Sequence, residues 1–147
     1  KPGTTGTLRL LRTESDILPV DRETLFELSI ASVPSGKVEN QSVKVAMRSV
    51  FKLFWRPEGL PGDPLEAYQQ LRWTRNSQGV QLTNPTPYYI NLIQVSVNGK
   101  ALSNVGVVPP KSQRQTSWCQ AIAPCHVAWR AINDYGGLSA KKEQNLP

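Results

Sequence analysis

Residues 41–57 (QSVKVAMRSVFKLFWRP) constrain the fold most, because they predict one long β-strand that carries two different patterns. Over residues 42–48 apolar residues alternate strictly with polar or small ones, which is typical of a strand with one exposed face. The apolar members of this alternation are Val43, Val45 and Met47. Over residues 50–55 the run is nearly continuously apolar, a pattern that favours a strand buried on both faces. The first half therefore presents an apolar face without an obvious cover, and the second half is expected to lie in a core.

Lys52 interrupts the second, continuously apolar half of this strand. A lysine is seldom fully buried unless its charge has a partner. The pattern alone favours an ordinary edge strand whose lysine extends its ammonium group into solvent. A special role for Lys52 has to be argued from other parts of the sequence.

The chain as a whole predicts an all-β protein. Short alternating runs and turn residues recur through its 147 residues, and no stretch keeps a helical period. With 39% hydrophobic residues it can form a packed core, as one domain or two small ones. The net charge of +6 is shared evenly between residues 1–57 and 58–147 and forms no basic run, so we expect no nucleic-acid partner.

A domain boundary is predicted at residues 57–64 (PEGLPGDP), which hold three prolines and two glycines. Residues 58–147 are expected to form an immunoglobulin-like β-sandwich. Its predicted elements are a helical turn at residues 64–70, strands at 71–74, 80–83, 88–97, 114–118 and 127–132, and a hairpin turn at Asn98-Gly99.

Residues 1–57 predict fewer strands than a whole domain of that type requires. Three strands are expected, at residues 4–12, 25–33 and 41–57. An immunoglobulin-like domain needs about seven. We therefore expect residues 1–57 to be the last strands of an incomplete domain.

Cys119 and Cys125 are the only cysteines, and His126 is the only histidine, so a tetrahedral zinc site lacks ligands. A disulfide between the two cysteines is favoured over two free thiols, and it fits an oxidising compartment. Neither a metal nor a cofactor is expected.

An enzymatic function is not expected either. Cys125 and His126 are adjacent, and neighbours in a strand point to opposite faces, so they are poorly placed as nucleophile and base. The pair of carboxylates Asp21 and Glu23 lies in a different block from Asp134, and nothing in the sequence brings the two blocks together. Asp134 is predicted to accept hydrogen bonds from nearby amides in a turn.

Four sequence blocks resemble those of periplasmic pilus-assembly chaperones of the PapD-like family, in that family's order. They are LPVDRE (residues 18–23), KLFWRP (52–57), NPTPYY (84–89) and INDYGG (132–137). The short polar connection at residues 34–40 is similar to that of the short-loop subclass. The resemblance covers most of the chain and implies that the N-terminal domain is truncated.

The resemblance implies a function in binding. The strand at residues 41–57 would be lent to a pilus subunit that lacks one, with Val43, Val45 and Met47 filling the open groove of that subunit. Lys52 would anchor the C-terminal carboxylate of the subunit, although the arginine that shares this task in the family has no counterpart here. Val43 and Lys52 are an odd number of residues apart, so a bulge or bend must separate them if both face the subunit. An outer-membrane usher would be the second partner, and the compartment would be the periplasm.

Two alternatives remain open. The chain could be a non-enzymatic binding or adhesion module that self-associates through the same exposed strand, or a nonfunctional remnant of a chaperone. Lys52 separates the first alternative from the chaperone, because an adhesion domain has no reason to keep a lysine within an apolar run.

Overall fold

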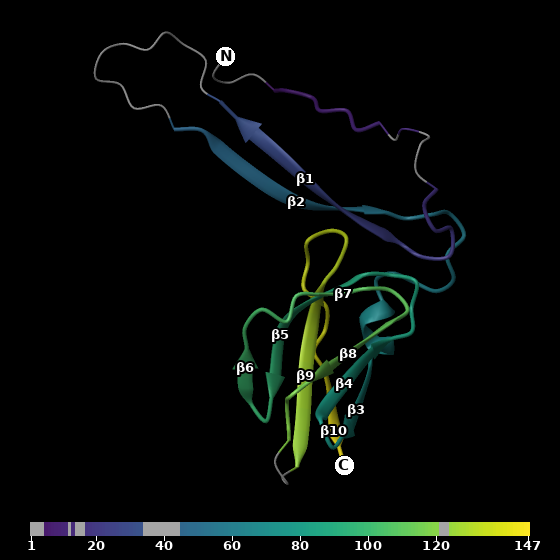
Figure 1. The fold of residues 1–147 in the computed structure, drawn as a ribbon, viewed down its shortest axis with the longest axis vertical. Helices are drawn as coiled ribbons and strands as arrows, with labels where there is room; N and C mark the ends of the chain where they lie inside the picture. Colours follow the sequence, from purple (N-terminus) through teal and green to yellow (C-terminus); the bar gives the residue numbers. More distant parts are fainter. Residues whose placement is uncertain (1–4, 12, 14–16, 34–44, 121–123) are drawn as a thin grey trace.

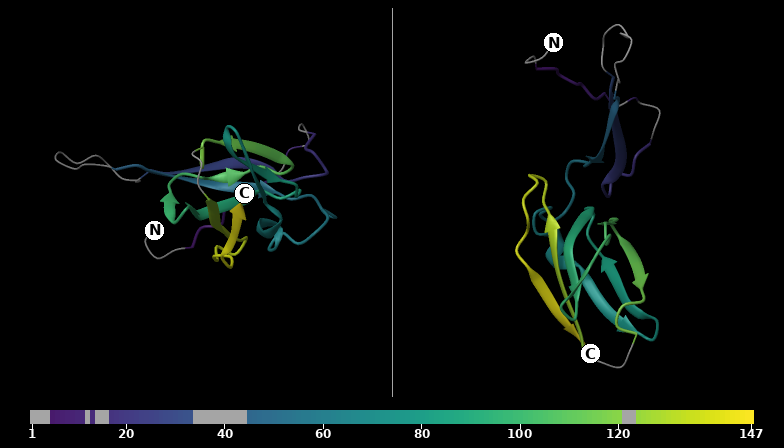
Figure 2. Two further views of the ribbon diagram at one scale, coloured as in Figure 1. Left: turned by 90° about the horizontal axis from the view of Figure 1, so that it is seen from below. Right: turned by 90° about the vertical axis from the view of Figure 1, so that its left-hand side faces the viewer.

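The computed structural model describes residues 5–11, 13, 17–33, 45–120 and 124–147. Within these ranges the chain forms the strands β1 to β10 and one short 3-10 helix (Figure 1). The strands lie in two parts, an N-terminal hairpin of β1 and β2 and a C-terminal sandwich of β3 to β10. The two parts are joined end to end, which makes the molecule elongated (Figure 2). None of the described residues belongs to a helix long and apolar enough to cross a membrane.

The hairpin consists of β1 (Thr24–Ser32) and β2 (Met47–Trp55), which pair antiparallel. Their register runs without a shift from Thr24 opposite Trp55 to Ser32 opposite Met47. β2 falls within the predicted strand region 41–57, and β1 matches the predicted strand at 25–33 except that it begins and ends one residue earlier. The beginning of the second region, residues 41–44, lies outside the described residues.

The strand predicted at residues 4–12 is wrong for the part that the structure describes there. Residues 5–11 are extended but form no strand (Figure 1). A strand is defined by the pairing of its backbone groups, and an alternating sequence does not by itself supply a partner.

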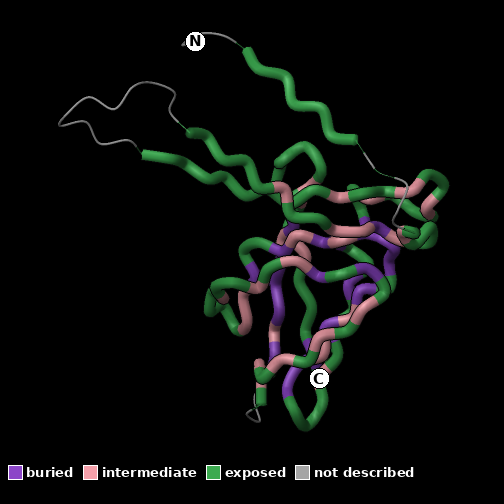
Figure 3. Tube along the Cα trace, turned by 45° about the horizontal axis from the view of Figure 1, so that its top comes forward, coloured by how far each residue is buried: buried purple, intermediate pink, exposed green. Residues whose placement is uncertain are grey.

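The hairpin is exposed on both faces, which contradicts the burial predicted for residues 50–55. Val50 is 53% exposed and Phe51 is 51% exposed. Figure 3 shows the hairpin as mostly exposed, whereas the buried residues gather in the sandwich. The two strands form a sheet of their own, and no second sheet covers it within the described ranges. An apolar sequence shows that a strand is suited to pack against a second layer of structure. It does not show that such a layer is present in the chain.

The sandwich contains one three-stranded and one five-stranded sheet. The first has the order β3-β4-β8, and the second has the order β10-β9-β5, with β6 and β7 both pairing with β5. Their bounds are β3 (Arg72–Asn76), β4 (Gly79–Asn84), β5 (Ile90–Val97), β6 (Lys100–Leu102), β7 (Val107–Val108), β8 (Ser112–Thr116), β9 (Cys125–Ile132) and β10 (Lys142–Leu146). The predicted helical turn is the 3-10 helix η1 (Ala67–Gln70). The short strands β7 and β10 were not predicted from the sequence, and β6 was implied only as the second arm of the hairpin turn at Asn98-Gly99.

The core lies between these two sheets and is built from alternating side chains of the strands. Trp73 is 1% exposed, and its ring centroid lies 5.3 Å from that of Trp129 and 6.0 Å from that of Trp118. Val80 and Leu82 on β4 are fully buried beside it. The arrangement is an immunoglobulin-like β-sandwich, so the predicted all-β fold class is confirmed.

Two local predictions for the sandwich are also confirmed. Asn98 and Gly99 both have positive φ, 49° and 78°, as a type I′ turn between β5 and β6 requires. Cys119 and Cys125 form a disulfide, and Cys125 is 1% exposed where β9 enters the core. The bond therefore ties the connection between β8 and β9 to the core.

Candidate partner-binding site on the hairpin and its junction with the sandwich

The apolar residues predicted to bind a partner lie at the start of β2. Met47 is its first residue and is 69% exposed, and Val45 just before it is 66% exposed. Val43 lies outside the described residues. In the described part of the chain β2 has a strand partner on one edge only, which is β1. Exposed apolar side chains thus lie beside unpaired backbone groups, a combination that favours pairing with another chain.

The register of the hairpin places Met47 and Lys52 on opposite faces. Residues directly opposite in a pair of strands share a face, and successive residues alternate between faces. Met47 pairs with Ser32, and Lys52 pairs with Glu27, with no shift between them. The bulge or bend that is needed if Val43 and Lys52 face the same partner stays a prediction for the stretch before Met47, and the register shows no bulge from Met47 to Lys52. A regular ladder with β1 leaves no extra residue there.

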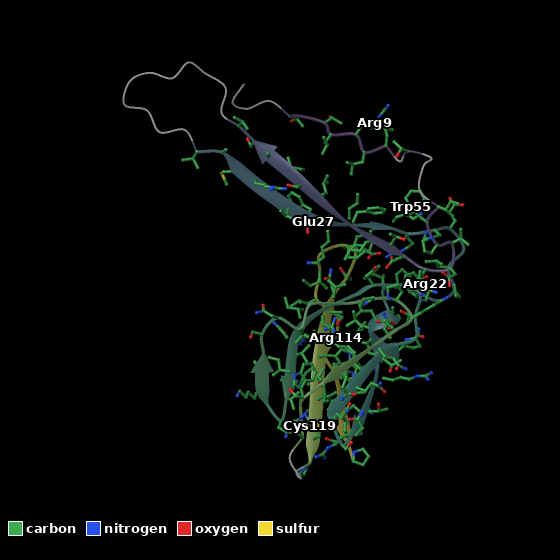
Figure 4. All side chains as sticks on the ribbon, viewed as in Figure 1. Arg9, Arg22, Glu27, Trp55, Arg114 and Cys119 are labelled. Carbon is green, nitrogen blue, oxygen red and sulfur yellow. A yellow bond between two sulfur atoms is a disulfide. The ribbon has the colours of Figure 1, made fainter. Side chains whose placement is uncertain are left out.

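Lys52 lies at an open cleft between the hairpin and the sandwich. The cleft has a volume of about 360 Å³, and its lining includes Lys52, Arg56, Tyr89, Ile132 and Asp134. Lys52 is exposed, and the paired residue Glu27 lies on the hairpin above the sandwich (Figure 4). The side chain therefore presents a cation to the cleft.

Arg56 joins the two parts of the molecule through two carboxylates. Its Nε donates to Glu23 Oε1 at 2.6 Å, and its two terminal nitrogens donate to the Asp134 carboxylate at 2.6 and 3.1 Å. Glu23 is almost completely buried, and its Oε2 accepts from the backbone N–H of Tyr89 at 2.6 Å. The hydrogen bonds from Arg56 to Asp134 and Glu23 raise the pKa of the guanidinium further, so it stays charged. The ring of Tyr88 lies 5.3 Å from the guanidinium carbon.

The sequence did not predict this cluster. Asp134 was expected to bond amides in its own turn, which is wrong: that task belongs to Asn133, whose Oδ1 accepts from the N–H groups of Tyr135 and Gly137. Asp134 instead reaches Arg56, 78 positions earlier in the sequence. The signal that could have led to the cluster is that all three charged residues lie within the four blocks.

A second ionic contact crosses the junction between the loop before β1 and the sandwich. Lys111 Nζ lies 2.6 Å from Asp21 Oδ2, and Arg22 Nε lies 2.9 Å from Asp21 Oδ1. The hydrogen bonds from Arg22 and then Lys111 hold the pKa of the Asp21 carboxyl well below its usual value. All three side chains are partly exposed, and ion pairs of this kind stabilise a fold only slightly.

The residues weighed as catalytic or metal-binding are used differently. The sulfur of Cys125 is bonded to Cys119, and His126 Nε2 lies 3.7 Å from Glu143 Oε2. Across the described ranges, no three His, Cys, Asp or Glu side chains are grouped so that they could hold a metal ion. The organised chemistry of this part of the chain is the charge network at the junction and the exposed edge of β2.

Both the hairpin part and the sandwich part of the chain match known protein families. The profile of the family described as "Pili assembly chaperone PapD, C-terminal domain" matches residues 66–143. The profile described as "Pili and flagellar-assembly chaperone, PapD N-terminal domain" matches residues 1–61. The chain belongs to the PapD family. The resemblance of the four sequence blocks is therefore confirmed, and the family is one of chaperones.

Relatives within the PapD family are similar along most of the chain. The chaperone protein FimC of Escherichia coli K12 is 35% identical over 139 residues, which are 92% of this chain and 57% of FimC. The probable fimbrial chaperone protein ElfD of the same strain is 41% identical over 121 residues, 81% of this chain and 52% of ElfD. The chain thus spans between half and three fifths of the length of these relatives.

A solved structure has the same fold. The SafB chaperone of Salmonella enterica, in complex with the SafA pilin, superposes with a TM-score of 0.74 at 30% identity. The match covers 88% of this chain and 62% of that one.

Proposed function

We propose that the chain is a periplasmic chaperone that binds a fimbrial or pilus subunit by adding the edge of β2 to the subunit's incomplete sheet. The observation that carries the proposal is the exposure of Val45 and Met47 beside an edge of β2 that no strand covers in the described ranges. Backbone hydrogen bonds would supply affinity, and alternate side chains entering the subunit would supply specificity. The capture of a pilin by the related SafB supports the choice of partner.

The remaining site residues have roles consistent with this proposal. Val43 continues the apolar alternation of Val45 and Met47 toward the partner. Lys52 offers its ammonium group to the subunit's C-terminal carboxylate at the cleft. The bound subunit would then pass to an outer-membrane usher. The disulfide between Cys119 and Cys125 supports a periplasmic location, because such bonds persist in oxidising compartments.

The test is co-expression of the chain with a fimbrial subunit followed by a pull-down. Val45→Glu should abolish most of the capture, because the charge would enter an apolar groove. Ala46→Glu adds the same charge at the adjacent position, on the other face of the alternation, and should have little effect. Equal losses in the two variants would refute the proposed contact face.

Self-association through the same edge is the second candidate, and the exposed Met47 favours it equally. Lys52→Ala separates the two functions. Capture anchored by a carboxylate should weaken sharply in this variant, whereas self-association measured by sedimentation should survive. Lys100→Ala, at the start of β6, serves as the control for the loss of one positive charge.

A further inference from the structure

Asn84 lies at the end of β4 and is fully buried. Its side-chain amide donates to the carbonyl of Tyr88 at 2.8 Å. Its Oδ1 accepts from the backbone N–H of Thr86 at 3.0 Å and from the Thr86 hydroxyl at 2.7 Å. The side chain therefore fixes the backbone of the loop formed by residues 85–89, which we call the first loop.

The same amide also holds a second loop, residues 109–111. Asn84 Nδ2 donates to the carbonyl of Pro109 at 2.9 Å. The backbone N–H of Lys111 donates to the carbonyl of Thr86 at 3.0 Å, which joins the second loop to the first. Lys111 adopts a positive φ of 50°, a conformation that residues with a side chain seldom take without support from their surroundings.

Both loops contact the segment before β1, at Glu23 and Asp21. In the first loop, the carbonyl of Pro87 accepts from the N–H of Glu23 at 2.9 Å, and the N–H of Tyr89 donates to the Glu23 carboxylate at 2.6 Å. In the second loop, Lys111 Nζ lies 2.6 Å from the Asp21 carboxylate. The contacts between this segment and the loops thus come from backbone and side-chain groups whose positions depend on Asn84.

A buried and fully satisfied polar network defines one backbone arrangement more narrowly than apolar packing does, since hydrogen bonds are directional. An apolar residue at position 84 would fill the space but would remove the amide donor from the carbonyl of Pro109, and it would leave the carbonyl of Tyr88 with only the more distant Thr86 hydroxyl at 3.3 Å. We infer that Asn84 is a positioning residue for the junction. It holds both loops where they meet the segment before β1 and so sets the angle between hairpin and sandwich. This inference does not depend on which partner the hairpin binds.

Amide hydrogen exchange of the full chain, followed by NMR, tests the inference. The amides of Glu23 and Tyr89 report on the junction, and the amides in the β4–β8 pairing report on the sandwich. Thr86→Val removes one hydroxyl from the Asn84 network and keeps its shape. It should speed exchange of the two junction amides about tenfold through local opening and leave the β4–β8 amides unchanged. Asn84→Asp places a carboxylate against carbonyl oxygens and should have a larger effect in the same direction.

Thr116→Val is the matched control. Thr116 donates its hydroxyl to the carbonyl of Val80 at 2.8 Å, so the control also loses one side-chain hydrogen bond of β4, but away from the junction. It should leave exchange of the Glu23 and Tyr89 amides unchanged. The inference is overturned if Thr86→Val does not affect those two amides, or if it speeds exchange across the sandwich to the same degree. If Asn84→Asp unfolds the sandwich, Thr86→Val decides alone.

Discussion

Arg56 and Asp134 form a two-pronged ion pair, with Nη1 to Oδ2 at 2.6 Å and Nη2 to Oδ1 at 3.1 Å, across the junction of hairpin and sandwich. This bidentate geometry fixes the orientation of the guanidinium plane as well as its distance from the carboxylate, because both hydrogen bonds have to form together. The same guanidinium then presents its Nε to the buried Glu23. The end of β2 is thereby attached to the sandwich in a defined orientation.

Replacing Arg56 by methionine should lower the free energy of unfolding by about 2 kcal/mol, because Glu23 would keep a buried charge with only one amide donor. Urea denaturation followed by tryptophan fluorescence measures the loss. Arg72→Met, on the exposed side of β3, is the control and should have little effect. The double variant with Glu23→Gln should recover part of the lost stability, and a further loss would contradict the explanation.

The carboxyl group of Asp21 should remain ionised well below pH 3.8, its value without neighbours, because Arg22 and Lys111 stabilise the charged form. The pKa of Asp21 is lower in the folded chain than in the unfolded one. The ion pair therefore contributes its full stability at pH values above the unfolded pKa of 3.8. The contribution is lost as the pH falls through the lowered pKa. The carbon-13 shift of the carboxyl group, followed through an acid titration, measures this. Lys111→Gln should move the midpoint upward, Lys100→Gln should not, and a midpoint near 3.8 in the unmodified chain would contradict the ion pair.

Replacing both Cys119 and Cys125 by serine should lower the free energy of unfolding of the sandwich by about 2 kcal/mol, the loop-closure value for a short loop. Thermal unfolding under non-reducing conditions compares the variant with the unmodified chain. Thiol labelling of the unfolded, unreduced chain should find no reactive groups. Two labelled thiols per chain would show that the bond does not form in solution.

Residues 58–147 should fold cooperatively without the hairpin, because β3 to β10 and their shared core all lie within them. The fragment should show a single sigmoidal transition on heating, at a temperature below that of the full chain, since Tyr89 would lose the Glu23 contact. A gradual change without a transition would place the domain boundary elsewhere. The proposed division at residue 57 depends on this result.

The fold of the sandwich could be read from the sequence because its signals are local. Asn98-Gly99 specifies its own turn, and alternation in β4 and β9 records burial that the structure contains. The junction could not be read in this way. Glu23, Arg56 and Asp134 come together only once the sandwich has formed. The position of a charged residue in the sequence carries no periodic pattern that identifies the residue with which it forms an ion pair. For the hairpin the local pattern gave a wrong prediction of burial. Its apolar residues predict a second layer of structure packed against it, and the described residues do not supply that layer.

The unbroken register of the hairpin also restricts how another molecule can approach it. Met47 and Lys52 lie on opposite faces of a sheet that has two strands in the part of the chain that the structure describes. A planar surface laid on either face contacts one of them and cannot reach the other. A molecule that contacts both has to pass around the outer edge of β2. A partner that contacts both Met47 and Lys52 therefore needs a concave surface, and a flat apolar surface would contact Met47 alone.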